Sequence, residues 1–285
     1  MRVPALRYLS LLLGAAALST SASVTASEPS FVPRFAPDVL TAWQVNHPDG
    51  DDYIDPTSGP GPVKYDPAHP FIPTQPDTPI QPTYRVADLN SPILKPWAKE
   101  QMKKANEEVF AGKIPYVARE RCWPAGTPAF VLEPPFNITL FIDTPKEILI
   151  VHQNDFQFRH VYMNVPHSKN PKPSWTGESV GHYEGDTLVV DTIGFNDRTF
   201  VDNYRTPHTA QMHVVERFRF INDGKVLEDE ISVDDPGAFN MPWKAIQRWN
   251  RTNRGPIEEI PCSENNENLF NYDVKPIPQA ARPDF

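Results

Sequence analysis

From about residue 129 onward, apolar and polar residues alternate along the chain, a period of two that is typical of half-buried β-strands. These segments are rich in Val, Ile, Phe and Thr and are bounded by Gly, Pro, Asn or Asp. The pattern therefore predicts a protein that is mainly β. The candidate strands span residues 136–142, 146–152, 156–165, 179–183, 186–195, 211–221 and 225–234.

The connections between these strands are short and contain turn residues. Glu184-Gly185 suits a tight hairpin because Gly accepts a positive φ, and Asn222-Asp223-Gly224 is a similar signal. Short connections predict an antiparallel meander. A meander of this many strands closes into a barrel of lipocalin-like shape or forms a sandwich, because either arrangement protects its edges.

Two segments precede the β region. Residues 27–91 are dense in proline, which disfavours helix interiors and central strands, but they also contain aromatic residues. We therefore expect an extended arm that is anchored on the body by its aromatic side chains. Residues 92–112 have apolar positions at helical spacing, which predicts one amphipathic helix. The β-barrel domain is then expected at residues 113–249, followed by a tail, residues 250–285, that packs on the barrel.

The N-terminus is typical of a secretory signal peptide. Arg2 and Arg7 form a basic start, and residues 9–18 are an apolar core too short to span a bilayer. Small residues at 24–26 suit a cleavage site, so we predict a signal peptide at residues 1–26. An uncleaved anchor is the alternative. We expect an exported protein that is periplasmic or secreted and not transmembrane, since no later stretch is sufficiently apolar.

The charge balance limits the classes of partner. The formal net charge is −9, and it becomes −11 once residues 1–26, with two arginines and no acidic residue, are removed. Binding to nucleic acid requires a basic patch, so this balance argues against a nucleic-acid partner. A small molecule is the expected ligand or substrate. The Pro-rich arm packs either on its own body or on a neighbouring subunit, and the second arrangement would make a homo-oligomer.

The chain contains two cysteines, Cys122 and Cys262. In an oxidising compartment we expect a disulfide bond that ties the start of the β region to the tail. A loop of this length would contribute about 4–5 kcal/mol in the chain-entropy account of disulfides. The alternative is two free thiols, one of them nucleophilic.

The strand at 211–221 contains the main catalytic candidate. Alternation places Glu216 and Phe218 on one face with apolar residues, and it places His213 on the other face. A carboxyl group among apolar neighbours has a raised pKa unless a cation or hydrogen-bond donors compensate, and general acids and bases arise in this way. Glu216 is therefore either a catalytic acid or base, or a structural Glu paired with an Arg inside the barrel.

The strand at 156–165 contains the candidate pocket wall. Phe158, His160 and Tyr162 share one face, which combines aromatic surface with hydrogen-bonding tips, as small-molecule pockets do. We predict that Phe158, His160 and Phe218 bind the ligand, and that Tyr162 donates a hydrogen bond to a developing oxyanion. The alternative is that this set forms an ordinary wet outer face.

Two further residues complete the candidate site. Asp191 lies between Val189 and Ile193 on its strand and is either a pocket acid that binds the ligand or a satisfied inward carboxylate. His208 lies in a loop and could serve as a second proton carrier at the mouth of the barrel. The alternative for His208 is a solvated loop histidine.

No metal and no cofactor is predicted. The sequence lacks a His-Glu-x-x-His motif, a cysteine pair at zinc spacing, a phosphate-binding loop and a dinucleotide fingerprint. Ser179 fits the letters of Gly-x-Ser-x-Gly, but a nucleophile elbow needs a strand–turn–helix context that the surrounding strands do not offer. Histidines gather in the β region, so a mononuclear metal site assembled from separate strands is the alternative.

The 175–197 stretch has a long motif, Trp-Thr-Gly-Glu-Ser-Val-Gly-His-Tyr-Glu-Gly-Asp-Thr-Leu-Val-Val-Asp-Thr-Ile-Gly-Phe-Asn-Asp, and it resembles a family of uncharacterised secreted bacterial proteins. The likeness covers about residues 120–265. It implies export and a shared β domain, and no activity is attached to the family. The positions that agree with the family pattern include Tyr162, Glu184, Asp186, Asp191, His208 and Glu216.

The chain departs from that family pattern at four positions. His160 and His182 stand where the family has Arg, Glu178 stands where it has His, and Tyr183 stands where it has Trp. The resemblance therefore implies no essential role for His160 or His182.

Three functions fit these residues. The first is a cofactor-independent acid–base enzyme, a lyase, hydratase or isomerase, that acts on a small, partly apolar molecule through Glu216, Tyr162 and His208. The second is a periplasmic small-molecule binding protein without catalysis. The third is a structural β domain, which a barrel interior filled by side chains would favour.

Overall fold

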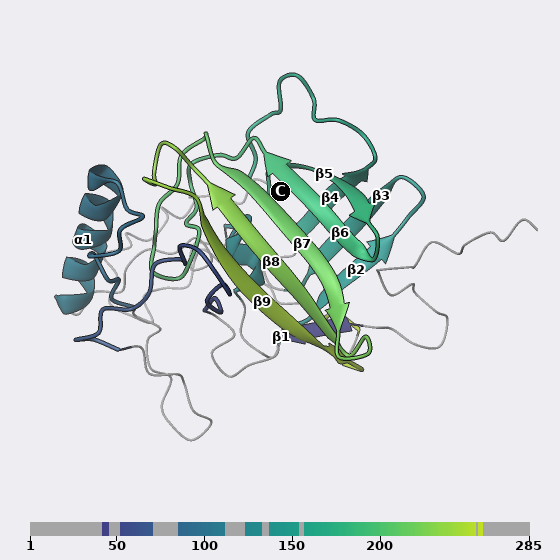
Figure 1. Cartoon of the computed structure of the whole chain (residues 1–285), viewed down its shortest axis with the longest axis horizontal. Coiled ribbons are helices and arrows are strands. Elements are labelled where there is room, and N and C mark those ends of the chain that lie inside the picture. The colour runs from purple at the N-terminus through teal and green to yellow at the C-terminus, as the bar shows by residue number, and fades with distance from the viewer. Residues whose placement is uncertain are drawn as a thin grey trace, which may run out of the picture.

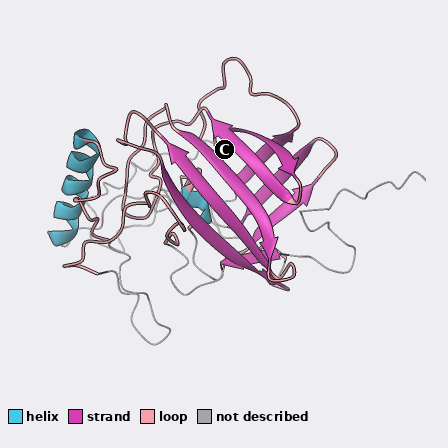
Figure 2. Ribbon diagram, in the orientation of Figure 1, coloured by secondary structure: helices cyan, strands magenta, loops and turns pink. Residues whose placement is uncertain are grey.

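The computed structural model describes residues 42–45, 52–70, 85–111, 123–132, 137–153, 157–254 and 256–258, and only the backbone of 42–45. These residues form nine β-strands, one α-helix and a short 3₁₀ turn (Figures 1 and 2). The prediction of a mainly β protein is confirmed. The strands are β1 (Ala42–Val45), β2 (Thr139–Asp143), β3 (Glu147–His152), β4 (Gln157–Met163), β5 (Glu178–Glu184), β6 (Thr187–Ile193), β7 (His213–Ile221), β8 (Val226–Asp234) and β9 (Trp243–Thr252).

Strands β2 to β9 form one mixed sheet that is curled into a half-barrel, and neighbours in the sheet follow the order of the chain. Strand β1 closes the ring, because it pairs with β9 from Ala42↔Thr252 to Val45↔Trp249 and with β2 through Trp43↔Thr139. The barrel form of the prediction is therefore confirmed.

One strand pair differs from the expected antiparallel meander. Strands β4 and β5 pair in parallel, from Val161↔Ser179 to Met163↔Gly181, whereas the other pairs are antiparallel. A parallel pair needs a crossover connection of a dozen or more residues, and the 164–177 segment supplies it. The prediction treated this proline-containing segment as an ordinary connection within a meander.

Two strands were not predicted. Strand β1 lies within the segment predicted as a Pro-rich arm, and β9 crosses the boundary placed between barrel and tail. In β9, Trp243, Ala245, Gln247 and Trp249 are buried on the inner face, but Ile246 on the outer face is buried too, which obscures the alternation.

The helix α1 (Pro96–Phe110) begins later than the 92–112 prediction, because Pro96 rather than an earlier residue starts its first turn. Its buried positions are Ala98, Met102 and Asn106. The Asn106 side chain accepts a hydrogen bond from the backbone N–H of Ala87 (2.9 Å) and donates one to the Ala87 carbonyl (2.9 Å). This reciprocal pair of hydrogen bonds joins α1 to the segment that contains Ala87. The helix lies beside one end of the barrel (Figure 1).

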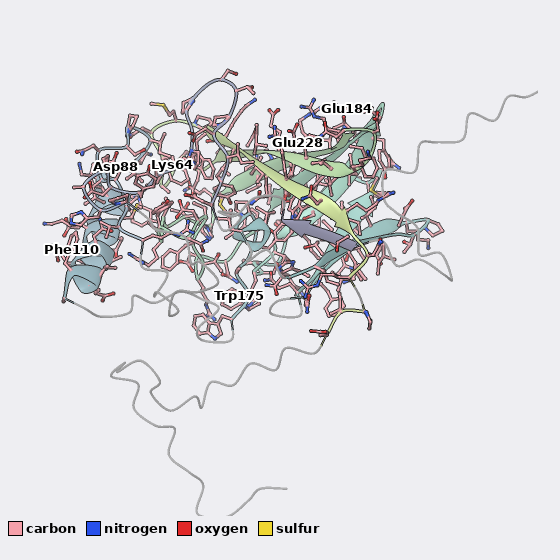
Figure 3. All side chains as sticks on the ribbon, turned by 90° about the horizontal axis from the view of Figure 1, so that it is seen from below. Lys64, Asp88, Phe110, Trp175, Glu184 and Glu228 are labelled. Atoms are coloured by element: carbon pink, nitrogen blue, oxygen red, sulfur yellow. The ribbon has the colours of Figure 1, made fainter. Side chains whose placement is uncertain are left out.

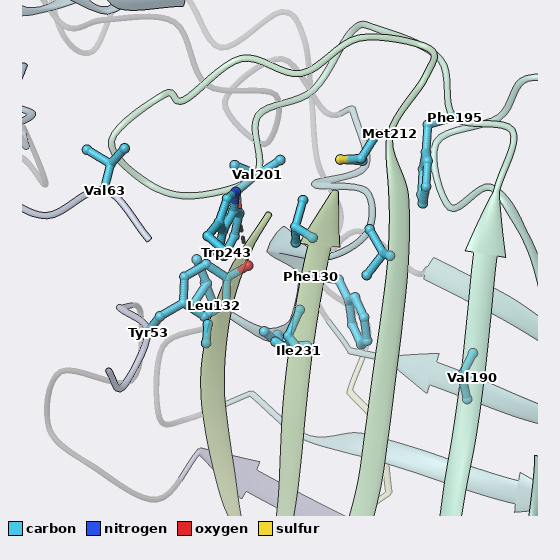
Figure 4. Close-up of a cluster of buried hydrophobic side chains, with 14 of the residues drawn as sticks. Tyr53, Val63, Phe130, Leu132, Val190, Phe195, Val201, Met212, Ile231 and Trp243 are labelled. Atoms are coloured by element: carbon cyan, nitrogen blue, oxygen red, sulfur yellow. Dashed lines mark hydrogen bonds between the residues drawn. The ribbon is translucent and has the colours of Figure 1, made fainter. Parts of the chain in front are cut away.

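Side chains fill the interior of the barrel. The Phe218 ring packs against Phe141 (ring centroids 5.5 Å apart) and Trp249 (6.3 Å). The 3₁₀ turn η2 (Ala129–Val131) inserts Phe130 into the same core, and Gln247 donates to the Val131 carbonyl at 3.2 Å. Figure 2 shows this turn behind the strands, and Figure 4 shows Phe130, Leu132, Ile231 and Trp243 gathered beneath them.

Among the described residues, no helix has both the length and the apolar character needed to cross a membrane.

Candidate functional site

Glu216, the main catalytic candidate, lies on β7 and points into the barrel, where it is fully buried. Arg159 of β4 reaches across the interior and binds both of its oxygens, with Nη1 2.9 Å from Oε1 and Nη2 in contact with Oε2. The same guanidinium donates to Ser179 Oγ (3.0 Å) and to Thr192 Oγ1 (2.8 Å). The pair is therefore bidentate, and two hydroxyl groups accept further hydrogen bonds from the guanidinium.

A second buried carboxyl group lies near this pair. Asp229 of β8 is fully buried, and its Oδ1 accepts a hydrogen bond from the backbone N–H of Arg217 at 3.2 Å. Its Oδ2 has no hydrogen-bond partner among the described residues. Burial, and then the nearby charge of Glu216, raise the pKa of Asp229 well above its usual value. One guanidinium thus faces two carboxyl groups, and burial favours the protonated form of the unsatisfied one.

This interior arrangement matches the structural interpretation of Glu216. Breaking a buried pair leaves an uncompensated charge, so such a pair holds its partners in place rather than releasing a proton easily. Phe218 also points inward, but it packs in the aromatic core and does not line an open wall.

Phe158, His160 and Tyr162 lie on the outer face of β4, opposite to the prediction. Phe158 is 56% exposed and Tyr162 is 46% exposed. His160 contacts Glu147 Oε2 through Nδ1 (2.8 Å) and stacks on Tyr162. The prediction that these residues line an interior pocket is wrong, because alternation sorts residues into two faces without telling which face is inside. The partner of Glu216, Arg159, occupies the inner face.

His208 lies in the loop between β6 and β7 and is buried. Its Nε2 is 2.9 Å from Thr199 Oγ1, and its Nδ1 is 3.2 Å from the Thr209 carbonyl. Burial lowers the pKa of His208, which favours the neutral ring. No hydrogen bond joins His208, Glu216 and Tyr162 within the described parts of the chain, so the structure does not assemble the predicted catalytic set.

Asp191 belongs to a different cluster, on the outer face of the sheet. It points outward from β6, not inward as one of the two interpretations held, and it is half-exposed. His213 of β7 contacts its Oδ2 through Nε2 at 3.0 Å, and His167 contacts its Oδ1 through Nε2 at 2.7 Å. One carboxylate is therefore shared by two imidazole rings.

Glu178 of β5 completes this outer cluster. Its Oε1 is 3.2 Å from His167 Nδ1 and accepts the backbone N–H of Ser168 at 2.7 Å. His167 and Ser168 belong to the crossover between β4 and β5, so these contacts fasten that loop to the sheet. We call His167, Glu178, Asp191 and His213 the outer cluster.

The register of the strands explains why the outer cluster forms. Glu178 pairs with Ile193, and Thr192 pairs with Val214, so Ile193 and His213 are also neighbours. Glu178, Ile193 and His213 thus form one row across the outer face, and Asp191 lies two residues along the same face of β6.

Electrostatics give the outer cluster a definite protonation pattern. The hydrogen bond to Asp191 raises the pKa of His213, and the charges of Asp191 and Asp234 add to this effect. The hydrogen bonds from His213 and His167 lower the pKa of Asp191. Hydrogen bonds from Ser168 lower the pKa of Glu178. The carboxylates are therefore ionised at neutral pH, and their charge favours the protonated form of His213.

Sequence reasoning missed His167, Glu178 and His213 as members of a site. The parity of Asp191 and His213 on adjacent strands was readable, and a correct β6–β7 register, in which Asp191 pairs with Val215, would have placed them as diagonal neighbours on one face. No local signal in the sequence locates His167, because a loop of that length can fold in many ways.

Several earlier predictions lie outside the described residues. They include both cysteines of the predicted disulfide bond, Cys122 and Cys262, and the signal peptide at residues 1–26. Among the residues that are described, no group of three or more His, Cys, Asp or Glu side chains could hold a metal ion. No protein-family model, curated protein or solved structure matches the chain.

Proposed function

We propose that the protein is an exported acid–base enzyme of the lyase, hydratase or isomerase type whose site is the outer cluster. The observation that carries the proposal is the pairing of Asp191 with His213 Nε2 at 3.0 Å, while Nδ1 of His213 makes no hydrogen bond or ion pair with a described residue. A half-exposed imidazole with one nitrogen fixed and the other open is the arrangement of a general acid or base.

Each member of the outer cluster has a distinct role in this proposal. Ionised Asp191 accepts the Nε2 proton of His213, so the neutral ring keeps its lone pair on Nδ1, directed away from the carboxylate. When Nδ1 takes a proton from a substrate, Asp191 stabilises the imidazolium that forms. His167 uses both of its nitrogens on Asp191 and Glu178, so it positions Asp191 rather than exchanging protons.

The surroundings of His213 fit a small, partly apolar molecule. Val180 and Val215 flank Asp191 in register on either side, and Ile193 lies between Glu178 and His213. All three side chains are half-buried on the outer face. They provide an apolar surface beside the open nitrogen, and the crossover loop that His167 fastens forms one border of it.

The test is a comparison of turnover between two histidine variants. The chain is incubated with a panel of small hydroxy, oxo and amino compounds, and products are measured by mass spectrometry. We expect His213→Gln to lower turnover by about 10²- to 10⁴-fold. His182→Gln is the matched control, because His182 is also an outward histidine beside a carboxylate, Glu184, at 3.3 Å. Equal turnover in His213→Gln and the native chain would disprove the proposal.

A structural β domain is the second candidate. The filled interior favours it, since Phe218, Phe141 and Trp249 occupy the space that a ligand would need in a lipocalin-like barrel. Native mass spectrometry of the purified chain distinguishes the candidates in part: a co-purifying small molecule would contradict a purely structural role.

A further inference from the structure

The outward carboxylates of β5 to β8 are almost all paired. Glu184 contacts Arg217 at 2.6 Å, and Glu230 contacts Lys244 at 3.0 Å. Glu228 lies between two arginines, Arg219 at 2.6 Å and Arg248 at 2.7 Å. Figure 3 labels Glu184 and Glu228 on the same side of the molecule. Glu178 and Asp191 are held in the outer cluster.

Asp234 is the exception in this set. It is the last residue of β8, it is exposed, and it lies directly opposite His213 in the β7–β8 register. Among the described residues, none makes a hydrogen bond or an ion pair with its carboxylate, whereas Glu230, four residues earlier on the same face, has Lys244. Its charge is nevertheless close enough to help raise the pKa of His213.

The charges around His213 therefore favour a cation. Asp191 and Glu178 share the two histidine rings, but Asp234 adds a carboxylate with no cationic side chain to balance it. Two basic side chains of β7 and β9, Arg217 and Lys244, are engaged by Glu184 and Glu230. A bound anion would meet this uncompensated charge and be repelled, whereas a bound ammonium group would neutralise it.

Resting on the proposed function of the outer cluster, we infer that its substrate is a small organic cation, such as a protonated amine with a short apolar part. Asp234 binds the ammonium group, Val215 and Ile193 contact the apolar part, and His213 Nδ1 faces an atom beside the charged group. The substrate charge is the partner that Asp234 lacks within the described chain.

The experiment compares three probes of one size, butylammonium, 1-butanol and butyrate, in NMR titrations of the full chain. The methyl signals of Val215 and Ile193 and the ring signals of His213 report binding. We expect saturable shifts with butylammonium only, and weaker binding at higher ionic strength. Asp234→Asn should weaken butylammonium binding about two- to fivefold, which is the size of an exposed ion pair. Glu230→Gln, the matched control, should leave it unchanged.

The outcomes separate this inference from the proposed function. Binding of butyrate as strong as that of butylammonium, no binding of butylammonium, or equal binding by Asp234→Asn and the native chain would each overturn the cation subsite. His213→Gln tests the catalytic role alone: it should keep butylammonium binding and lose turnover. Turnover that survives in His213→Gln would disprove the catalytic role of His213 while leaving the cation subsite in place.

Discussion

Asp191 and Glu216 lie on neighbouring strands of one sheet, but they face opposite sides and have opposite environments. Glu216 is fully buried and is held by Arg159, which donates to both of its oxygens. Asp191 is half-exposed and is shared by two imidazole rings, one of which keeps an open nitrogen. The difference shows that a carboxylate among apolar residues marks a functional site only when its partners leave a group free to react.

The largest expected effect comes from the interior. Arg159→Met leaves Glu216 buried without its cation, and we expect a loss of about 3–5 kcal/mol in the free energy of unfolding, measured by urea denaturation. The double variant Arg159→Met, Glu216→Leu should recover most of that loss, since it removes both charges. A single variant that loses less than about 1 kcal/mol would contradict the structural role of the pair.

The next effect concerns the pH dependence of stability. Burial raises the pKa of Asp229 above its unfolded value, so the folded state keeps a proton that the unfolded state releases. Stability should therefore fall as the pH rises from about 4, the pKa of an unfolded aspartate, to the pKa of Asp229 in the folded protein. Asp229→Asn should flatten this fall and make the chain more stable at pH 7 than the native chain. Identical profiles for both chains would show that Asp229 is ionised.

A smaller effect is expected on the outer face. Asp191→Asn removes the charge that raises the pKa of His213, so the pKa of His213 should fall, as measured by NMR titration of the ring. Glu184→Gln is the control, because Glu184 contacts a different histidine. The change in unfolding free energy should stay below about 1 kcal/mol, since the pair is half-exposed.

The same pair has its own pH window. The raised pKa of His213 adds stability at low pH that is lost as the pH rises through that pKa, and the lowered pKa of Asp191 adds stability that is lost as the pH falls through it. The pair therefore stabilises the fold most between the two values. Asp191→Asn should remove this maximum, and a maximum that persists would mean that other groups cause it.

The smallest effect is expected at Tyr162. Its side chain is exposed on β4 and is separated from Asp191 by Val180 of β5 in the strand register, so Tyr162→Phe should change the unfolding free energy by less than about 0.5 kcal/mol and leave turnover intact. A loss of turnover comparable to that in His213→Gln would place the active site on β4 instead.

Local pattern accounts for much of the fold. The strands from β2 to β8 and the helix α1 were predictable because their side chains alternate or repeat at helical spacing. The parallel β4–β5 pair was not predictable, because the 164–177 crossover shows no signal that separates it from a long hairpin connection. Strand β9 was missed because Gln247 points inward and Ile246 is buried on the outer face.

The sites follow the same rule. The inner position of Glu216 was predicted correctly from the apolar residues on its face, and the opposite position of His213 from parity. The pairing of Glu216 with Arg159 depends on contacts across the barrel, and the outer cluster depends on the β5–β6–β7 register together with a loop residue, His167. Contacts of this kind arise only when distant segments meet, so a pattern along the chain does not reveal them.

The pairing of β1 with β9 has a consequence for the order of folding. These strands come from distant parts of the sequence, and β1 also touches β2, so the ring closes at a point where early and late segments meet. Contacts between segments so far apart carry a large loop-closure cost and form slowly. The sheet from β2 to β8 can assemble from neighbours, whereas the closing strand has to wait until β9 has been synthesised.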